Sequence, residues 1–292
     1  MDHFANKGDD VTIIDNLSSN VLPENYFNSV ADLFIGDIAD ISFLDAVFSR
    51  EYDYIFHFAA NASVSESVKK EDLNFKSNVI GTYNIIRKAA KLRPSIIFAS
   101  TSAIYGEYNG KRVSEQDFAR PVSPYGLSKL IDEDLCFHYG LMYWIKVVAF
   151  RLFNVYGPRQ RRYVMPDLME KISQASKKTP EKDIVMLGTG DEIRDLVNIK
   201  DVMRALMLPL KHDDMWGQAY NVGSGTYTKI KDVVYLVLNE LNERYNITFS
   251  GKSWQGDISG LYADINKIRR VGFDPVIDLR TGIREFIEAE SK

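Results

Sequence analysis

Hydrophobic residues in the first half of the chain fall in short continuous runs that alternate with segments of helical periodicity. Continuous apolar runs are typical of strands buried on both faces, and apolar residues spaced three and four apart are typical of helices that pack on a sheet. The alternation predicts a parallel sheet covered on both faces by helices. Strands are expected at residues 11–14, 33–38, 52–60, 95–100 and 144–153, and helices at 1–7, 41–48, 78–92 and 125–139.

Beyond Gly157 and Pro158 the pattern changes. The predicted strands become shorter, and long amphipathic helices dominate. No internal repeat or low-complexity tract is present. Helices are expected at residues 166–177, at 230–245 and at 278–288, and strands at 184–187 and 219–222. Residues 194–199 are expected to lead to a helix capped near Asp201.

Composition narrows the class of protein. The chain has 292 residues, 45% of them apolar, which suffices for one large domain or two closely packed ones. A net charge of -4 without any long basic run argues against nucleic acid or anionic lipid as the main partner. Cys136 is the only cysteine, so a reducing, cytoplasmic location is expected. The four histidines lack ligand spacing, and no apolar run could span a membrane, so neither a metal site nor a membrane anchor is expected.

Tyr125 and Lys129 are the residues most indicative of chemistry. Their spacing puts them on one face of a predicted helix. A cation fixed beside a phenol stabilises the phenolate and lowers the phenol pKa from about 10, which makes a base. Thr101, at the end of the preceding strand, can hydrogen-bond the same oxygen or a substrate. The spacing also suits an ordinary amphipathic helix, since Tyr227 and Lys231 share it without chemical residues around them.

Two further sites are open to two interpretations. Asp15 ends the first predicted strand, where an acidic residue of a dinucleotide-binding sheet accepts hydrogen bonds from the adenosine ribose. A turn aspartate is the alternative, since Asn16 and other polar residues follow. The densest local cations form either a patch for a diphosphate or a solvated loop, and they are Arg159, Arg161 and Arg162.

A series of short motifs connects these residues, and their order and spacing are specific. With them the sequence resembles the extended short-chain dehydrogenase/reductase family, and within it the nucleotide-sugar epimerases, above all those that act on C4 of UDP-glucose. The motifs are DNL (15–17), GDI (36–38), HFAA (57–60), STSAIYG (100–106), SPYGLSK (123–129), RLFNVYGPR (151–159), RD (194–195), YNVG (220–223) and GD (256–257).

The resemblance implies an α/β fold with a Rossmann-type doubly wound parallel sheet and a smaller C-terminal α/β domain. Residues 1–157 and 196–224 would form the dinucleotide-binding domain, and residues 158–195 and 225–292 the nucleotide-sugar-binding domain. Tyr125 would be the catalytic base, Lys129 would hold the nicotinamide ribose, and Thr101 would assist. The residues implied to bind NAD are Asp15, Asn16, Ser18, Asp37, Ile38, Phe58, Ala59, Ala60, Asn78, Ser100, Tyr125 and Lys129. Those implied to bind the UDP-sugar are Thr101, Ser102, Tyr125, Phe153, Asn154, Arg194 and Asp257.

The reaction implied is inversion at C4 of UDP-glucose or UDP-galactose. Tyr125 would take the proton from the 4-hydroxyl, and a transient 4-keto sugar would turn over in the pocket. Family members that eliminate water or decarboxylate carry acidic residues directly after the hydroxyl residue. This chain has Ser102 and Ala103 there, which favours epimerisation without elimination. Rival interpretations are a 4-reductase or an epimerase for another sugar such as a uronic acid.

The start of the chain departs from the family. The family opens with a strand and a glycine-rich turn that receives the pyrophosphate, whereas Gly8 is the only glycine here before Gly36. We therefore expect the sheet to lack its first strand and Gly-rich loop, and NAD to bind poorly. A cofactor-deficient, non-catalytic homologue is the corresponding alternative. The helices at 78–92 and 125–139 resemble those that pair in family dimers, so a homodimer is expected.

Overall fold

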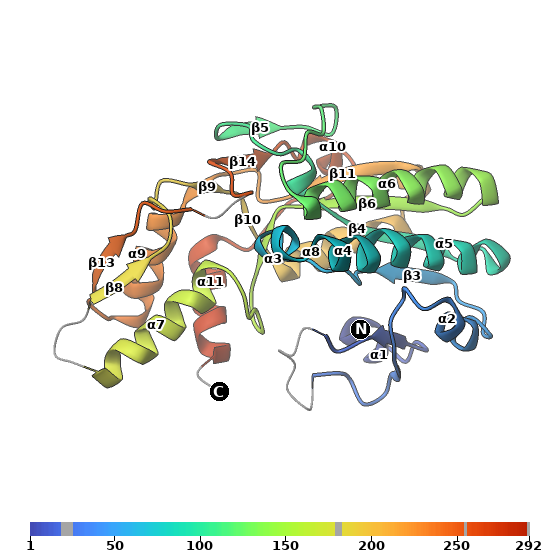
Figure 1. Ribbon diagram of the computed structural model, residues 1–292, viewed down its shortest axis with the longest axis horizontal. Coiled ribbons are helices and arrows are strands. Elements are labelled where there is room, and N and C mark those ends of the chain that lie inside the picture. Colours follow the sequence, from blue (N-terminus) through green and yellow to red (C-terminus); the bar gives the residue numbers. More distant parts are fainter. Residues whose placement is uncertain (19–25, 179–182, 254–255, 291–292) are drawn as a thin grey trace.

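A parallel sheet of four strands forms the centre of the molecule (Figure 1). The computed structural model describes residues 1–18, 26–178, 183–253 and 256–290. The sheet order is β11-β6-β4-β3, so the inner strands are β6 and β4. These strands are β3 (Tyr54–His57), β4 (Ser95–Thr101), β6 (Val147–Leu152) and β11 (Gln218–Val222).

The alternation of side chains along β4 explains why helices cover both faces of this sheet. Successive residues of a strand point to opposite faces. Ile96 and Phe98 pack with Cys136 of α6 in one buried cluster, and Ile97 packs with Leu206 of α8 in another. Cys136 is fully buried. The covering helices are α5 (Gly81–Leu92) and α6 (Pro124–Tyr143) on one face, and α8 (Ile199–Leu206) and α10 (Asn266–Arg269) on the other.

The first two strands form a sheet of their own. They pair in parallel, with Thr12 opposite Asp32. Within the described residues, β1 is hydrogen-bonded to β2 alone, and β3 to β4 alone. An apolar cluster that includes Leu44 and Ile85 holds this small sheet beside α5. The elements involved are α1 (Asp2–Ala5), β1 (Thr12–Asp15), β2 (Asp32–Ile35) and α2 (Ile41–Val47).

The C-terminal part packs around a second core, in which Phe286 and Val234 are fully buried. One parallel pair, β8 with β13, and three helices enclose this core. Two short sheets, β12-β9-β14-β5 and β10-β7, lie between it and the central sheet (Figure 1). The helices are α7 (Val164–Lys178), α9 (Ile230–Leu241) and α11 (Leu279–Glu290). The strands are β5 (Lys111–Val113), β7 (Asn154–Tyr156), β8 (Asp183–Met186), β9 (Ile193–Arg194), β10 (Leu196–Asn198), β12 (Thr228–Lys229), β13 (Asn246–Phe249) and β14 (Gly260–Ala263).

The α/β class and the parallel pairing are confirmed, while several predicted bounds shift. The strand expected over 33–38 ends at Ile35, because Asp37 turns the chain by accepting a hydrogen bond from the Ala39 N–H at 2.8 Å. The helix expected over 230–245 ends at Leu241, where Asn242 adopts a left-handed conformation with φ 54°. The helix expected from 78 is preceded by a continuous π-helical turn and α4. The remaining elements are α3 (Val64–Lys69), α4 (Glu71–Phe75), η1 (Lys76–Ile80), η2 (Ser102–Ile104), η3 (Leu208–Leu210) and η4 (Asp213–Met215).

Helices in the part of the chain that the structure describes are too short or too polar to cross a bilayer.

Candidate active site

The N-terminus of α6 lies directly against the end of β4. The Ser123 hydroxyl caps the helix by accepting a hydrogen bond from the Gly126 N–H at 3.1 Å, and Pro124 occupies the first turn. A Cβ added to Gly126 would lie 2.5 Å from the carbonyl oxygen of Ala103, which follows β4. Only glycine therefore permits this close approach, which brings Tyr125 beside Thr101.

Tyr125 and Thr101 are brought together as the sequence predicts. The Thr101 side chain lies near enough to the Tyr125 hydroxyl to lower the phenol pKa. Burial raises the pKa of the Tyr125 phenol, Tyr163 and the negative charge of Asp132 act in the same direction, and Thr101 acts against them. In this arrangement the phenol is therefore a weaker acid than free tyrosine.

Lys129 lies on the same helix, but its ammonium group is paired elsewhere. Its side chain is 2% exposed, with Nζ 3.6 Å from Asp132 Oδ2 and 3.9 Å from the ring centre of Phe98. Burial lowers the pKa of Lys129, and the Asp132 charge opposes that shift. The expected lowering of the phenol pKa is not found in this structure, where burial raises that pKa and the Lys129 ammonium pairs with Asp132.

Ser100 was expected to contact the cofactor, and the structure gives it an internal role. Its hydroxyl donates to Glu133 Oε2 at 2.7 Å, and Ser100 is 3% exposed. Arg151 donates to Glu133 through Nε and Nη2, and through Nη1 to the Tyr105 hydroxyl at 2.9 Å. The Tyr105 hydroxyl in turn donates to Asn221 Oδ1 at 2.7 Å. This buried network ties α6 to β4, β6 and β11.

Asn78 also has an internal role rather than a place beside the cavity. It is fully buried. Its Oδ1 accepts from the Asn61 N–H at 2.7 Å, and its Nδ2 donates to the Ser128 hydroxyl at 2.8 Å. Asn78 therefore fastens the loop after β3 to α6, at a residue three positions after Tyr125.

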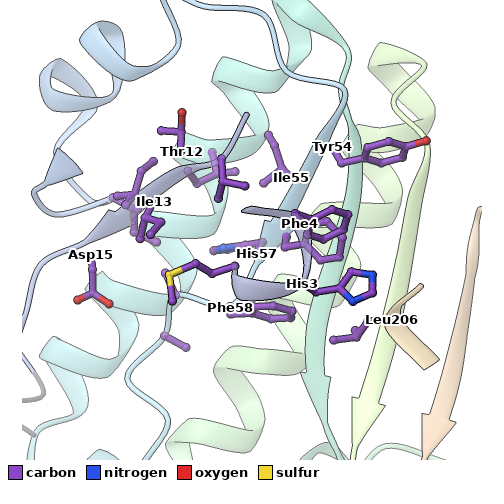
Figure 2. Close-up of a pocket in the computed structure, with 18 of the residues that line it drawn as sticks. His3, Phe4, Thr12, Ile13, Asp15, Tyr54, Ile55, His57, Phe58 and Leu206 are labelled. Carbon is purple, nitrogen blue, oxygen red and sulfur yellow. The ribbon is translucent and has the colours of Figure 1, made fainter. Parts of the chain in front are cut away.

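A cavity of about 1930 Å³ opens between β1 and β3. Figure 2 shows Thr12, Ile13 and Asp15 of β1 on one side and side chains of β3 on the other. Phe4 of α1 lies against β3, with its ring centre 5.1 Å from that of Phe56. The predicted cofactor residues that line this cavity are Asp15, Asn16, Ser18, Asp37, Ile38, Phe58, Ala59 and Ala60. The lining does not include Asn78, Ser100, Tyr125 or Lys129.

The carboxylates that follow β1 and β2 each bind the backbone through Oδ1. Asp15 Oδ1 accepts from the Leu17 N–H at 2.7 Å, and Asp37 Oδ1 accepts from the Ala39 N–H. Both interpretations of Asp15 are thus compatible with the structure, since it makes a turn and also lines the cavity. The three arginines after β7 line the same cavity, and two of them form exposed ion pairs with Asp2 and Glu290.

The predicted substrate residues fall into two groups. Arg194 Nη2 and Asp257 Oδ1 form an ion pair at 2.7 Å, in which the two side chains are 15% and 9% exposed. Gly256, the neighbour of Asp257, lies beside Ser123 at the start of α6, so this pair is close to the Tyr125 helix. Asn154, at the start of β7, and Ser102, in η2, are partly exposed, whereas Phe153 is 4% exposed and belongs to the central core.

The sequence does not indicate that Asp132, His57 and Thr82 lie beside Lys129. The His57 ring Nε2 and the Thr82 hydroxyl lie 2.8 Å apart, and burial together with the Lys129 charge lowers the pKa of His57 to about 3. Asp132 follows Lys129 by one helical turn, so the rule that pairs Tyr125 with Lys129 could have found it. Within the described residues, no group of three His, Cys, Asp or Glu side chains is placed to hold a metal ion.

The cavity fits the adenosine end of NAD and fits the pyrophosphate less well. Carboxylates at the ends of two parallel strands suit ribose and adenine groups, and the small residues Ala59 and Ala60 permit close approach. A Cβ added to Gly8 would meet nothing within 4 Å, so this glycine provides no tight backbone cradle. Residues that would hold the adenosine are Asp15, Asn16, Asp37 and Ile38.

A parallel α/β sheet with a Thr-Tyr-Lys constellation at the end of one strand defines a dinucleotide-dependent enzyme of the short-chain dehydrogenase/reductase class. Residues 1–223 match the model of the NAD dependent epimerase/dehydratase family, and the chain belongs to this family. The resemblance found in the sequence is confirmed.

Similar proteins and solved structures agree with this assignment. A protein of Methanocaldococcus jannaschii described as a putative UDP-glucose 4-epimerase is 29% identical over 98% of this chain and 92% of its own. The UDP-glucose 4-epimerase of Thermotoga maritima, solved with UDP-glucose, superposes with a TM-score of 0.91 at 27% identity and covers 99% of this chain and 93% of its own. The UDP-glucose 4-epimerase of Thermus thermophilus, solved with NAD, gives a TM-score of 0.87 at 28% identity over the same shares.

Proposed function

We propose that this chain is an NAD-dependent epimerase that inverts C4 of a UDP-sugar and interconverts UDP-glucose and UDP-galactose. The observation that carries the proposal is the placement of Tyr125 beside Thr101, with Lys129 one turn further along the same helix. The two solved relatives described above, one with UDP-glucose and one with NAD, support the choice of substrate and cofactor.

The chain's own residues would act in sequence. Tyr125, as phenolate, accepts the proton of the sugar 4-hydroxyl, while Thr101 holds the reacting oxygen in place. Lys129 stabilises the phenolate once its ammonium group reaches the phenol. Bound NAD would supply the hydride-transfer chemistry at C4 of the sugar. Tyr125 then gives the proton back to the inverted 4-oxygen, and the transient 4-keto sugar turns over between the two steps.

Positioning of the nucleotide would fall to Arg194 and Asn154. A guanidinium group matches phosphate oxygens bidentately, and the Arg194–Asp257 ion pair holds that group in one orientation. Ser102 and Ala103 follow Thr101 without a carboxyl group, which supports epimerisation rather than elimination. The C-terminal residues 158–195 and 225–292 would form the nucleotide-sugar-binding domain, and residues 1–157 and 196–224 the dinucleotide-binding domain.

A cofactor-poor homologue is the second candidate, and the open space between β1 and β3 favours it. Among the described residues, neither strand pairs on the side that faces the cavity. We therefore expect this chain to bind NAD weakly. Equilibrium dialysis with NAD measures this, and a stoichiometric complex that survives gel filtration would contradict the expectation.

Conversion of UDP-galactose to UDP-glucose in the presence of added NAD, followed by chromatography, tests the proposed function. Tyr125→Phe should abolish conversion, because the ring stays in place while the proton acceptor is lost. Tyr227→Phe is the matched control, since Tyr227 has a lysine at the same spacing and is 56% exposed; it should convert sugar like the parent chain. UDP-glucuronic acid in parallel reactions distinguishes an epimerase for uronic acids, and conversion retained in Tyr125→Phe would refute the assignment.

We also propose a homodimer through α5 and α6. Tyr83, Tyr139 and Tyr143 form a chain of ring contacts along these helices, and Leu141 is 76% exposed. A surface of this kind is normally covered by a partner. Sedimentation equilibrium should give twice the chain mass, and a single-chain mass at micromolar concentration would count against the dimer.

A further inference from the structure

Asp132 is an acidic side chain buried beside the proposed catalytic pair. It follows Lys129 by one turn of α6 and is fully buried. Neither of its carboxylate oxygens has a well-formed hydrogen bond to any of the described residues. The contact with Lys129 Nζ, at 3.6 Å, is an ion pair that is too long for a good hydrogen bond. A buried carboxylate with so little compensation is costly, so its presence in this core calls for a physical explanation.

The elements around Asp132 contribute few other charges. Glu133 is bound to Arg151, and burial raises the pKa of the Cys136 thiol, which keeps it neutral. Because burial and the Lys129 charge lower the pKa of His57, that ring is neutral as well. Burial raises the pKa of Asp132 itself to about 6, while Lys129 and Thr82 oppose this shift. The groups that face the Asp132–Lys129 pair are His57 from β3, Thr82 from α5, Phe98 from β4, and Glu133 and Cys136 from α6.

The Lys129 ammonium can therefore pair with either of two groups on its own helix, the Asp132 carboxylate or the Tyr125 phenolate. Tyr125 lies four residues before it and Asp132 three residues after it, and both spacings place side chains on one helix face. In this structure the ammonium pairs with Asp132. Burial and Tyr163 raise the phenol pKa of Tyr125, and the Asp132 charge adds a smaller effect in the same direction.

We propose that Asp132 is a positioning residue that holds the Lys129 ammonium away from the Tyr125 hydroxyl, so that carboxylate and phenolate compete for one cation. The inference rests on the proposed function for the role of Tyr125 as base. In this proposal, Asp132 controls how readily the Tyr125 phenolate forms. Protonation of Asp132, or its replacement by a neutral isostere, releases Lys129 toward the phenol.

Phenolate absorbance measures this competition without any sugar or cofactor. The titration of Tyr125 is obtained by subtracting the curve of Tyr125→Phe from that of the parent, and likewise in the Asp132→Asn background. Removal of the carboxylate should move the phenolate midpoint down by at least about one pH unit, equivalent to tenfold more phenolate at a fixed pH below the midpoint. Asp134→Asn, which removes an exposed charge from the same helix, should leave the midpoint in place. An unchanged or raised midpoint in Asp132→Asn would overturn the proposal.

Lys129→Met provides a second test, whose expected result would not arise if Asp132 had a purely structural role. In the parent the cation is held by Asp132, so Lys129→Met should shift the phenolate midpoint little. In the Asp132→Asn background the cation is free to reach Tyr125, so the same substitution should raise the midpoint by about one unit or more. Equal shifts in the two backgrounds would show that Lys129 serves Tyr125 regardless of Asp132, and would refute the competition.

The pH profile of kcat/KM for UDP-galactose separates this inference from the proposed function. The acidic limb of the profile should move to lower pH in Asp132→Asn and stay in place in Asp134→Asn. A shifted phenolate midpoint without turnover of any sugar would leave the inference standing and remove the proposed function. Turnover with an unshifted midpoint would remove the inference and leave the function.

Discussion

Removal of one partner of the Glu133–Arg151 ion pair should cost more stability than removal of one partner of any surface pair. The two side chains are 4% and 12% exposed, and Arg151 donates to Glu133 at 2.5, 3.1 and 3.2 Å. Glu133→Leu would leave the guanidinium in the core without its partner and the Ser100 hydroxyl without its acceptor. Removal of one partner of a buried pair costs about 3–5 kcal/mol. We expect that loss for Glu133→Leu and again for Arg151→Met.

The double variant distinguishes an ion pair that stabilises the fold from two buried charges that destabilise it only when one is left unpaired. With both charges absent, Glu133→Leu/Arg151→Met should cost no more than either single change, because an apolar pair of similar volume replaces the ions. Urea unfolding followed by tryptophan fluorescence gives the free energies, and the cycle should show a coupling of at least about 3 kcal/mol. Asp32→Asn is the control, since its ion pair with Arg50 is 59% and 54% exposed and should be worth less than about 1 kcal/mol. Single variants that cost as little as this control would refute the reasoning.

Three further outcomes are expected. Gly126→Ala places a Cβ 2.5 Å from a backbone carbonyl and should displace Tyr125 by about 1 Å, which lowers turnover on the order of 100-fold. Gly140→Ala is the control, because its Cβ meets a side chain at 2.8 Å near the other end of α6. This control should lower the unfolding temperature without the loss of turnover. His57 takes up its proton at pH 6.5 in the unfolded chain and only near pH 3 in the folded one. The free energy of unfolding should therefore fall by about 1.4 kcal/mol per pH unit as the pH drops from 6.5 to 3. The unfolding temperature of His57→Gln should lack this dependence on pH. Arg194→Lys should raise KM for UDP-galactose about tenfold with kcat nearly unchanged, since a lysine cannot bind a diphosphate bidentately.

The sequence predicts the arrangement of the central sheet well, because continuous apolar runs and helical periodicity are local signals. It predicts the meeting of Thr101 and Tyr125 as well, since both lie near the ends of well-marked elements. It does not reveal that α4 and the π-helical η1 precede α5 without a break. The residues 71–80 carry too few apolar positions to mark a helix, and tertiary contacts with α6 decide their conformation.

The roles of Ser100 and Asn78 could not be predicted for a different reason. Each is a polar residue close to a ligand-binding edge, and the family pattern assigns such residues to the cofactor. The structure buries both, and each satisfies a partner on α6, Glu133 in one case and Ser128 in the other. A hydroxyl at a strand end can face a ligand or a helix, depending on how closely the helix packs against the strand. This packing is a property of the assembled fold and cannot be read from the local sequence.

Helix α6 thus combines the chemistry and the stability of the protein in one element. The Ser123 cap and the Gly126 contact fix its N-terminus, and the Glu133–Arg151 pair fixes it two turns later. Between these anchors lie Tyr125 and Lys129, so substitutions that loosen an anchor should lower stability and turnover together. Asp132 lies in the same stretch without a well-formed hydrogen bond to any of the described residues. A change there should alter the acidity of the base while the helix stays in place, which separates the two effects that the anchors couple.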